Sequence, residues 1–162
     1  MKSRPKIGLK EFARRRKELA AMMDENGIAI LPGASLVSRN SDVDYSFRQD
    51  SDFHYLTGFD EQDAVFVLIP SREHGEAILF CRERDPEQEQ WHGKITGPER
   101  AMQLYGMDDA FPISDIDDIL PGLIEGKPRL YYAMGHRQDF DTRVISWVNS
   151  IASSQHKGTK PP

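Results

Sequence analysis

Residues 39–59 read RNSDVDYSFRQDSDFHYLTGF, and this stretch carries most of what the sequence reveals about the chain. It combines four aspartates with two arginines and a series of aromatic side chains, a mixture that neither an amphipathic helix nor a strand requires. The acidic members are Asp42, Asp44, Asp50 and Asp52, and the aromatic members are Tyr45, Phe47, Phe53, Tyr55 and Phe59. Two interpretations follow from the pattern. The stretch is either a surface loop held by ion pairs and anchored by its rings, or a place where neighbouring carboxylates differ in pKa and serve chemistry.

The end of the stretch has the pattern of a short capped helix. Asp50 and Asp52 precede or begin a helix over residues 53–57 and could accept hydrogen bonds from the free amides of its first turn. Gly58 would let the chain turn before the next aromatic residue. Four side chains are expected to bury against a sheet: Phe53, Tyr55, Leu56 and Phe59.

Upstream, residues 11–26 have the pattern of an amphipathic helix. Its apolar positions recur at helical spacing: Phe12, Leu19, Met22 and Met23. We expect the basic run at residues 14–17 on the solvated face, and Gly27 as a left-handed cap that ends the helix.

Short apolar runs separated by turn residues predict the strands of a sheet. The expected strands cover residues 28–31, 64–69, 76–81, 110–111 and 129–133, with a further extended piece at 35–38. Residues 70–75 would join two of these strands as a hairpin, so the sheet has antiparallel neighbours.

Helices are predicted between and after the later strands. One is short and covers residues 87–90. The next begins at Pro98, because proline suits the first helical turn, and ends at Gly106. A third begins at Ser114, where Asp117 completes a capping-box-like start, and runs to residue 124 with Pro121 predicting a kink or an early end.

The last strong helix is predicted over residues 139–152. Four apolar residues are expected on one side of it: Val144, Ile145, Val148 and Ile151. Helices thus alternate with strands and one hairpin, and the sequence predicts an α/β fold of three layers with a mixed sheet between helices.

Length and composition limit the possible classes of protein. A chain of 162 residues with 38% hydrophobic and 29% charged residues should form one domain with a sizeable core. Its net charge of −5 argues against nucleic acid as a partner, which needs a basic face. The single cysteine, Cys81, lies in an apolar run and is expected to be a core or edge-strand thiol rather than a nucleophile. No stretch reaches the length of a membrane span, so we expect a soluble, cytoplasmic protein without a membrane partner.

The sequence lacks the common motifs of metal sites, hydrolase active sites and nucleotide-binding loops. The five histidines are scattered, and none belongs to a His-Glu-x-x-His arrangement. There is no Gly-x-Ser-x-Gly elbow, phosphate loop or dinucleotide fingerprint either. We therefore expect neither catalytic residues nor a metal site built by this chain alone.

Several segments together resemble the N-terminal domain of Xaa-Pro aminopeptidases, also called aminopeptidase P. They are residues 39–45, 47–53 and 55–59, followed by 63–70, the Trp-His-Gly at 91–93 and the tail at 158–162. The resemblance implies the creatinase-type, ribonuclease H-like N-terminal fold, with a mixed sheet of roughly six strands. It also implies that residues 1–152 form this domain, and that residues 153–162 are a linker toward an absent C-terminal catalytic domain of the pita-bread fold.

Enzymes of this family remove the N-terminal residue ahead of proline, using two manganese ions held in the C-terminal domain. The resemblance therefore implies a parent metallopeptidase acting on peptides with proline at the second position. This fragment alone should be inactive. The N-terminal domain would pack beside its own catalytic domain, narrow access to the active site, and mediate contacts in a homodimer or tetramer.

Three residues are candidates for contact with the substrate cleft: Asp42, Trp91 and Arg39. The resemblance implies that Trp91 forms an aromatic wall of the cleft, whereas a core or hairpin-capping tryptophan is the alternative. Asp42 could order a side chain near the metal site or bind the substrate amine. The alternative for Asp42 is an ion pair with Arg39 or Arg48.

Two other functions remain open on the sequence. One is a stand-alone protein-binding module, since peptidase-like domains of this family also serve as non-catalytic modules, and the negative charge would suit a basic partner. The other is the N-terminal domain of a prolidase or creatinase relative, which should match residues 39–59 less well.

Overall fold

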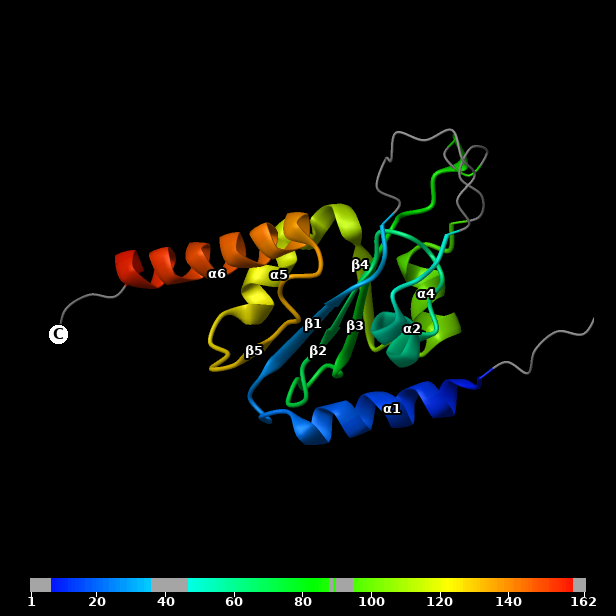
Figure 1. Ribbon diagram of the computed structural model, residues 1–162, viewed down its shortest axis with the longest axis horizontal. Coiled ribbons are helices and arrows are strands. Elements are labelled where there is room, and N and C mark those ends of the chain that lie inside the picture. The colour runs from blue at the N-terminus through cyan, green and yellow to red at the C-terminus, as the bar shows by residue number, and fades with distance from the viewer. Residues whose placement is uncertain (1–6, 36–46, 88, 90–94, 159–162) are drawn as a thin grey trace, which may run out of the picture.

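The computed structural model describes residues 7–35, 47–87, 89 and 95–158, and in these residues a mixed sheet lies between two layers of helices (Figure 1). The sheet has the strand order β4-β3-β2-β1-β5. Its strands are β1 (Ile28–Pro32), β2 (Val65–Leu68), β3 (Ala77–Cys81), β4 (Asp109–Pro112) and β5 (Leu130–Tyr131). The predicted α/β class and mixed sheet are confirmed, and the described residues contribute five strands where roughly six were expected.

The first four strands pair in their order along the chain, and β5 returns to pair with β1 at the other edge of the sheet. β2 and β3 form the predicted antiparallel hairpin, with Val65 opposite Phe80, and β1 pairs antiparallel with β2. The outer strands are both parallel to their neighbours, β4 to β3 and β5 to β1. β2 and β3 are buried along their whole length, because helices cover both faces of the sheet.

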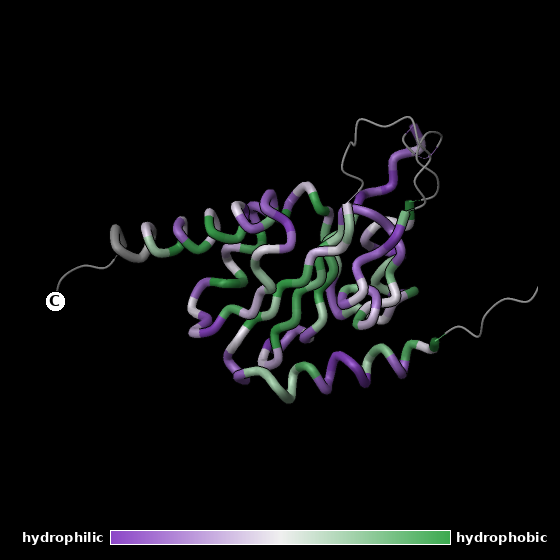
Figure 2. Tube along the Cα trace, in the orientation of Figure 1, coloured by the Kyte–Doolittle hydropathy of each residue, from purple (hydrophilic) through white to green (hydrophobic). Residues whose placement is uncertain are grey.

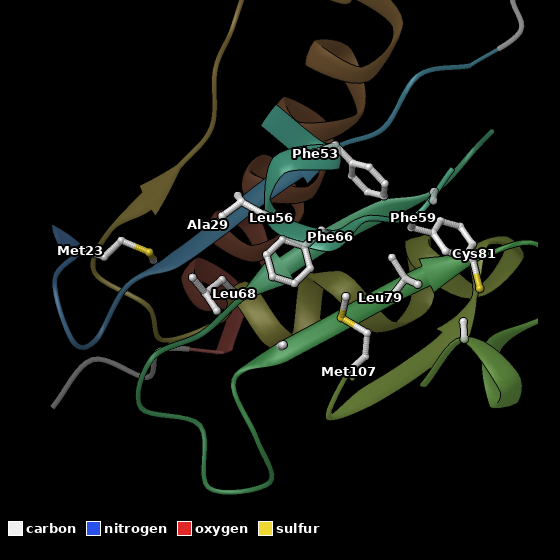
Figure 3. Packing of buried hydrophobic residues seen from close by; sticks show 13 residues of the cluster. Met23, Ala29, Phe53, Leu56, Phe59, Phe66, Leu68, Leu79, Cys81 and Met107 are labelled. Carbon is white, nitrogen blue, oxygen red and sulfur yellow. The ribbon is translucent and has the colours of Figure 1, made fainter. Parts of the chain in front are cut away.

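The helices divide between the two faces of the sheet. On one face lie α1 (Leu9–Met22), α2 (Ser51–Thr57) and α4 (Pro98–Tyr105), and on the other lie α5 (Ile116–Ile124) and α6 (Gln138–Gly158) (Figure 1). A short 3-10 turn, Ile113–Asp115, precedes α5. Successive strand residues point to opposite faces. Phe66 and Leu68 therefore belong to the core under α2 (Figure 3), while Val65 and Val67 belong to the core under α5 and α6. Apolar residues are concentrated in the central strands (Figure 2).

The short helix α2 confirms the predicted cap by Asp50 and the turn at Gly58, but it begins at Ser51, so Asp52 lies within its first turn instead of capping it. The Asp50 carboxylate accepts a hydrogen bond from the Phe53 backbone amide at 2.9 Å, and Gly58 ends the helix in the left-handed conformation. Phe53, Leu56 and Phe59 are buried, but Tyr55 is 49% exposed, so its predicted burial is wrong. The Tyr55 ring instead lies 4.2 Å from the guanidinium of Arg15 on α1.

Two predictions about α1 are corrected by the structure. The helix ends at Met22, and Gly27 is not a left-handed cap. A side chain at Gly27 would come within 2.9 Å of the Tyr131 ring, so this glycine permits close approach to β5. Within the basic run, Arg16 is buried rather than solvated, because its guanidinium reaches the backbone oxygens of Leu56 and Gly106.

The helices α4 and α5 lie where the sequence predicts them, but the predicted cap of α5 is wrong. α4 begins at Pro98 and ends at Gly106 as predicted. Ser114 does not cap α5, which starts after the 3-10 turn without a side-chain cap, and α5 continues through Pro121 to Ile124. Burial of Ile116, Leu120 and Ile124 explains why the helix persists past the proline.

α6 begins one residue earlier than predicted and continues through Gly158, into the stretch expected to be a linker. The predicted apolar side is partly wrong: Val144 is buried, but Ile145 and Val148 are 47% and 40% exposed. Phe140 and Trp147 take their place on the buried side. Of the extended piece predicted at 35–38, only Ser35 is described, and it belongs to no strand.

Candidate functional site

The three cleft candidates from the sequence all lie outside the described residues. Arg39 and Asp42 fall within residues 36–46, and Trp91 falls within residues 90–94. The described residues that flank these two segments are therefore the part of the site whose geometry the structure gives.

Gln49 joins the two sides of the first segment. Its side-chain oxygen accepts hydrogen bonds from the backbone amides of Ala34, at 2.7 Å, and Asp50, at 3.0 Å. Its side-chain nitrogen donates to the backbone oxygens of Phe59, at 2.9 Å, and Glu61, at 3.0 Å. All of the hydrogen-bonding capacity of this amide is used within the protein.

A glycine next to β1 makes room for this arrangement. A Cβ atom at Gly33 would lie 2.9 Å from the side-chain oxygen of Gln49, and 3.2 Å from the backbone oxygen of Ala64. Both distances are too short for ordinary contact. Any larger residue at Gly33 would displace Gln49 from the Ala34 amide.

The second segment is joined in the same manner by Glu89. Its carboxylate accepts a hydrogen bond from the Ile95 backbone amide at 3.2 Å, and Arg84 pairs with it at 3.4 Å. The Glu89 side chain thus connects the chain before residue 90 to the chain after residue 94.

Glu61 connects these two places. Its backbone oxygen accepts from Gln49, while its carboxylate accepts from the Thr96 backbone amide, at 3.1 and 3.2 Å, and from the Thr96 hydroxyl. Arg82 lies 3.7 Å from the carboxylate, and both side chains are largely buried. We call the group Gln49, Glu61, Arg82, Glu89 and Thr96 the anchor network.

Two buried atoms beside Glu61 have no hydrogen-bond partner among the described residues. They are the Nε of Arg82 and the side-chain oxygen of Gln62. Unsatisfied buried polar atoms are uncommon in folded proteins. The neighbourhood of Glu61 therefore differs from an ordinary packed core.

A cavity of about 770 Å³ adjoins the anchor network. It lies beyond the carboxyl ends of the parallel strands β1 and β5, a common position for binding sites in α/β sheets. Leu31, Pro32 and Tyr131 provide apolar lining, and Gln49 belongs to its wall. The ionisable residues around it are Arg48, Asp50, Asp52, His136, Arg137 and Asp139.

Arg137 holds one wall of this cavity in place. It donates to the Gly33 backbone oxygen at 2.8 Å and pairs with Asp139, also at 2.8 Å. The hydrogen bond from Arg137 lowers the pKa of the Asp139 carboxyl from its ordinary value. Arg137, which directly precedes α6, therefore connects the start of this helix to the end of β1.

The described residues include one thiol, Cys81, on the inner strand β3. Cys81 is fully buried, which confirms its prediction as a core thiol, and this burial, with a further contribution from Glu61, raises its pKa to about 12. No group of three or more His, Cys, Asp or Glu side chains in the described part of the chain could hold a metal ion. No helix in that part is both long and apolar enough to cross a membrane.

Sequence reasoning missed Gln49, Glu61 and Arg137. Gln49 lies inside residues 39–59, but no sequence pattern around a glutamine predicts that its side chain forms four hydrogen bonds. Glu61 contacts Thr96 across 35 residues of chain, and no local pattern reveals such a pairing.

The fold and the site define a three-layer α/β domain in which described residues on either side of 36–46 and of 90–94 belong to one hydrogen-bonded network. Residues 12–131 match the aminopeptidase P N-terminal domain, so the chain belongs to that family.

Similar proteins include enzymes from several organisms. The chain is 39% identical to the Xaa-Pro aminopeptidase of Escherichia coli over 95% of this chain and 34% of that protein. It is 31% identical to the mitochondrial intermediate cleaving peptidase 55 of Arabidopsis thaliana, over 94% of this chain and 30% of the relative. The chain thus spans about a third of the length of these relatives.

Solved structures agree with this assignment. The aminopeptidase PepP of Pseudomonas aeruginosa superimposes with a TM-score of 0.89 at 59% identity, covering 96% of this chain and 35% of that one. Zn-substituted aminopeptidase P of E. coli, in complex with product, has a TM-score of 0.88 at 34% identity, covering 98% and 36% of the two chains.

Proposed function

We propose that this chain is the N-terminal, non-catalytic domain of an Xaa-Pro aminopeptidase, an enzyme that releases the residue preceding proline. The observation that carries the proposal is the match to the E. coli enzyme, which takes in 95% of this chain but 34% of the relative. The remaining two thirds leave room for a catalytic domain. We assign residues 1–152 to the N-terminal domain and residues 153–162 to the connection with the catalytic domain.

Metal chemistry is assigned to that second domain, with two manganese ions as the expected cofactor. The described residues of this chain do not fit such a centre, because they offer no cluster of metal ligands. When bound in the catalytic domain, the metal pair would supply an activated water. The part of this domain in the reaction is to bind and orient the peptide.

Asp42, Trp91 and Arg39 are proposed to contact the peptide at the mouth of the cleft. The support is indirect: the residues flanking both of their segments belong to one hydrogen-bonded network beside a cavity. We also propose that the domain narrows access so that peptides enter, and that it contributes contacts to a homodimer or tetramer in the cytoplasm.

An activity assay tests the assignment of catalysis. The 162-residue chain and the longer natural polypeptide would be incubated with manganese and a peptide with proline at position two. We expect release of the N-terminal residue by the longer polypeptide only. Turnover by the purified 162-residue chain that follows its elution profile would contradict the proposal, and so would an inactive longer polypeptide that is folded and metal-loaded.

The cleft assignments are tested in the longer polypeptide with Asp42→Ala and Trp91→Ala. Each should lower kcat/KM for peptides of five or more residues about tenfold, equivalent to ~1.4 kcal/mol. Folding, followed by circular dichroism, should be unchanged. Arg14→Ala is the control, because Arg14 lies on the exposed side of α1. Kinetics equal to those of the control would remove both residues from the cleft.

A further inference from the structure

Strand β1 is longer than the edge strand beside it. β5 pairs with β1 only at Ile28 and Ala29, whereas β1 continues to Pro32 and is paired with β2 on its other side up to that residue. Figure 1 shows β1 running on past the end of β5. Among the described residues, the stretch from Ile30 to Pro32 is therefore an open sheet edge on the β5 side.

Two backbone hydrogen bonds show which groups point to this open side. The Ile28 amide donates to the residue directly before β5 at 3.0 Å, and the Gly33 amide donates to the residue directly before β2 at 2.7 Å. Backbone groups along a strand alternate between its two neighbours, so Ile30 and Pro32 share the direction of Ile28. Proline has no backbone N–H and is confined in sheets to such edges. At Pro32 the open side thus offers only a carbonyl oxygen.

The backbone oxygens of Ile30 and Pro32 are available to a donor from outside the described residues. β5 ends before it reaches them, and no backbone amide of the described loops donates to either oxygen. Backbone groups near a core are normally paired. An N–H group placed in the cavity next to this edge would pair them.

The cavity of about 770 Å³ lies along this edge. Its lining includes residues 29–35 of β1 and its extension, and residues 131–133 at the end of β5. Sites for small ligands have volumes of roughly 300–1,000 Å³, and an open edge of three residues corresponds to about 10 Å of extended chain. We call this cavity and the open edge of β1 the edge groove.

Helices on both sides decide what can enter the edge groove. Leu19 of α1 and Ser51 of α2 line it from one layer, and Asp139 of α6 lines it from the other. The edge of a second folded sheet would bring its own flanking helices into collision with these. A single extended segment needs no such room, and strand addition to an open edge is a common mode of peptide binding.

The two layers give the edge groove different side chains. Leu19, Leu31 and Tyr131 provide apolar surface next to α1, whereas Arg137 lines it next to α6. Arg137 uses three of its five N–H groups on Gly33 and Asp139, so two remain for a ligand carbonyl. Side chains of an extended peptide point alternately to opposite faces. An apolar side chain beside a polar one therefore suits this groove.

We propose that the edge groove binds an extended peptide segment with alternating apolar and polar side chains, whose backbone N–H groups donate to the oxygens of Ile30 and Pro32. The occupant is the stretch of the substrate that follows proline, an assignment that rests on the proposed function. Binding of the peptide itself is a property of this chain and is measurable without catalysis.

Titration of the 162-residue chain with a peptide tests the groove. The probe is acetyl-Ser-Leu-Ser-Leu-Ser-amide, and the protein carries ¹³C at its backbone carbonyls. We expect the carbonyl resonances of Ile30 and Pro32 to shift with one common Kd, because both oxygens gain a hydrogen bond. The carbonyl resonances of Val144 and Val148 in α6 should not move. Unchanged Ile30 and Pro32 resonances at millimolar peptide would overturn the proposal.

N-methylated peptides test whether the contact is strand addition. One version carries methyl groups on both leucine amides, and the other carries them on the amides of the second and third serines. Only alternate amides of an extended segment face the sheet edge. One version should therefore bind at least about tenfold more weakly, equivalent to ~1.4 kcal/mol, and the other should bind like the parent peptide. Equal affinities of the two versions would contradict strand addition.

A matched pair of substitutions locates the site on the protein. Ala133 is exposed and lines the edge groove, so Ala133→Phe should block it and weaken peptide binding at least about tenfold. Ala152→Phe is the control, because Ala152 is exposed on α6 and lies outside the groove lining. Circular dichroism should be unchanged in both. Equal peptide affinities would contradict the site, and so would self-association of the wild-type chain that only Ala133→Phe abolishes, since a second copy would then occupy the groove.

Kinetics of the longer polypeptide test the assignment of the occupant. Ala133→Phe should raise KM about tenfold for peptides with four or more residues after proline, and should leave KM for an Xaa-Pro tripeptide unchanged. Ala152→Phe should resemble wild type with both. An unchanged KM for the longer peptides would remove the substrate from the groove. If the polypeptide proves to be no Xaa-Pro aminopeptidase, the proposed function fails, while the titration still decides whether the groove binds a peptide.

Discussion

At the scale of single residues, Arg16 has an unusual environment, because the residue is only 6% exposed yet forms no ion pair among the described residues. Burial lowers its pKa from the ordinary value, and Asp108 partly offsets this effect. The side chain donates to Leu56 and Gly106, whose oxygens lie at the carboxyl ends of α2 and α4. Helix carboxyl ends carry partial negative charge, so they substitute for a carboxylate.

We predict that Arg16→Met destabilises the domain by about 2–3 kcal/mol, because methionine fills the space of the stem but leaves buried backbone oxygens without donors. Urea unfolding followed by circular dichroism measures the change. Arg14→Met is the control and should have little effect, because Arg14 is exposed and its ion pairs within the described part of the chain are with exposed Glu11 and Glu18. Equal unfolding midpoints for the two variants would show that the buried contacts of Arg16 add nothing.

At the scale of elements, α5 and α6 are joined by one carboxylate. Asp117 on α5 accepts hydrogen bonds from the Trp147 indole at 2.8 Å and from Arg143 at 3.0 Å, both on α6. The bond from Trp147, followed by that from Arg143, lowers the pKa of Asp117 below its ordinary value of 3.8. The packing of the two helices is therefore linked to the ionisation of this group.

The sign of the resulting pH dependence follows from the lowered pKa. The stabilising contribution of Asp117 is complete above its ordinary value and is lost as the pH falls through the lower value in the folded protein. We predict that Asp117→Asn makes unfolding less sensitive to acid in this range, because asparagine still accepts from Trp147 but does not titrate. Urea unfolding at pH values from about 5 down to about 2 measures this.

Asp118→Asn is the control for this series, since Asp118 lies on the exposed side of the same helix. It should retain the acid sensitivity of the wild-type chain. If Asp117→Asn and wild type lose stability in parallel, the α5 to α6 contact does not depend on this carboxylate.

At the scale of the whole molecule, two helical layers enclose a sheet whose inner strands are apolar on both faces. This architecture was predictable because continuous apolar runs such as residues 65–68 must be covered on both sides. The hairpin, the start and end of α4 and the cap of α2 by Asp50 were predictable as well, because proline, glycine and aspartate act through local backbone geometry.

Predictions from local sequence patterns failed where the environment of a residue is set by contacts with residues far away in the sequence. Tyr55, Ile145 and Val148 are apolar or aromatic at helical spacing, but the side of each helix that faces the sheet is set by the packing of the layers. Arg16 belongs to a basic run that looks solvated in the sequence, but in the fold its guanidinium donates to backbone oxygens at the ends of α2 and α4. Gly27 has the place of a helix cap, but its neighbour is the Tyr131 ring on β5.

The sequence by itself determined the class of the domain, most of its elements and its membership of the aminopeptidase P family, because periodicity, turn residues and a long contiguous motif are all local. Only the tertiary structure decided that Gln49, Glu61 and Thr96 form one network and that a cavity lies beside it. The physical reason is that these contacts join residues far apart along the chain, and the sheet must form before their donors and acceptors can meet.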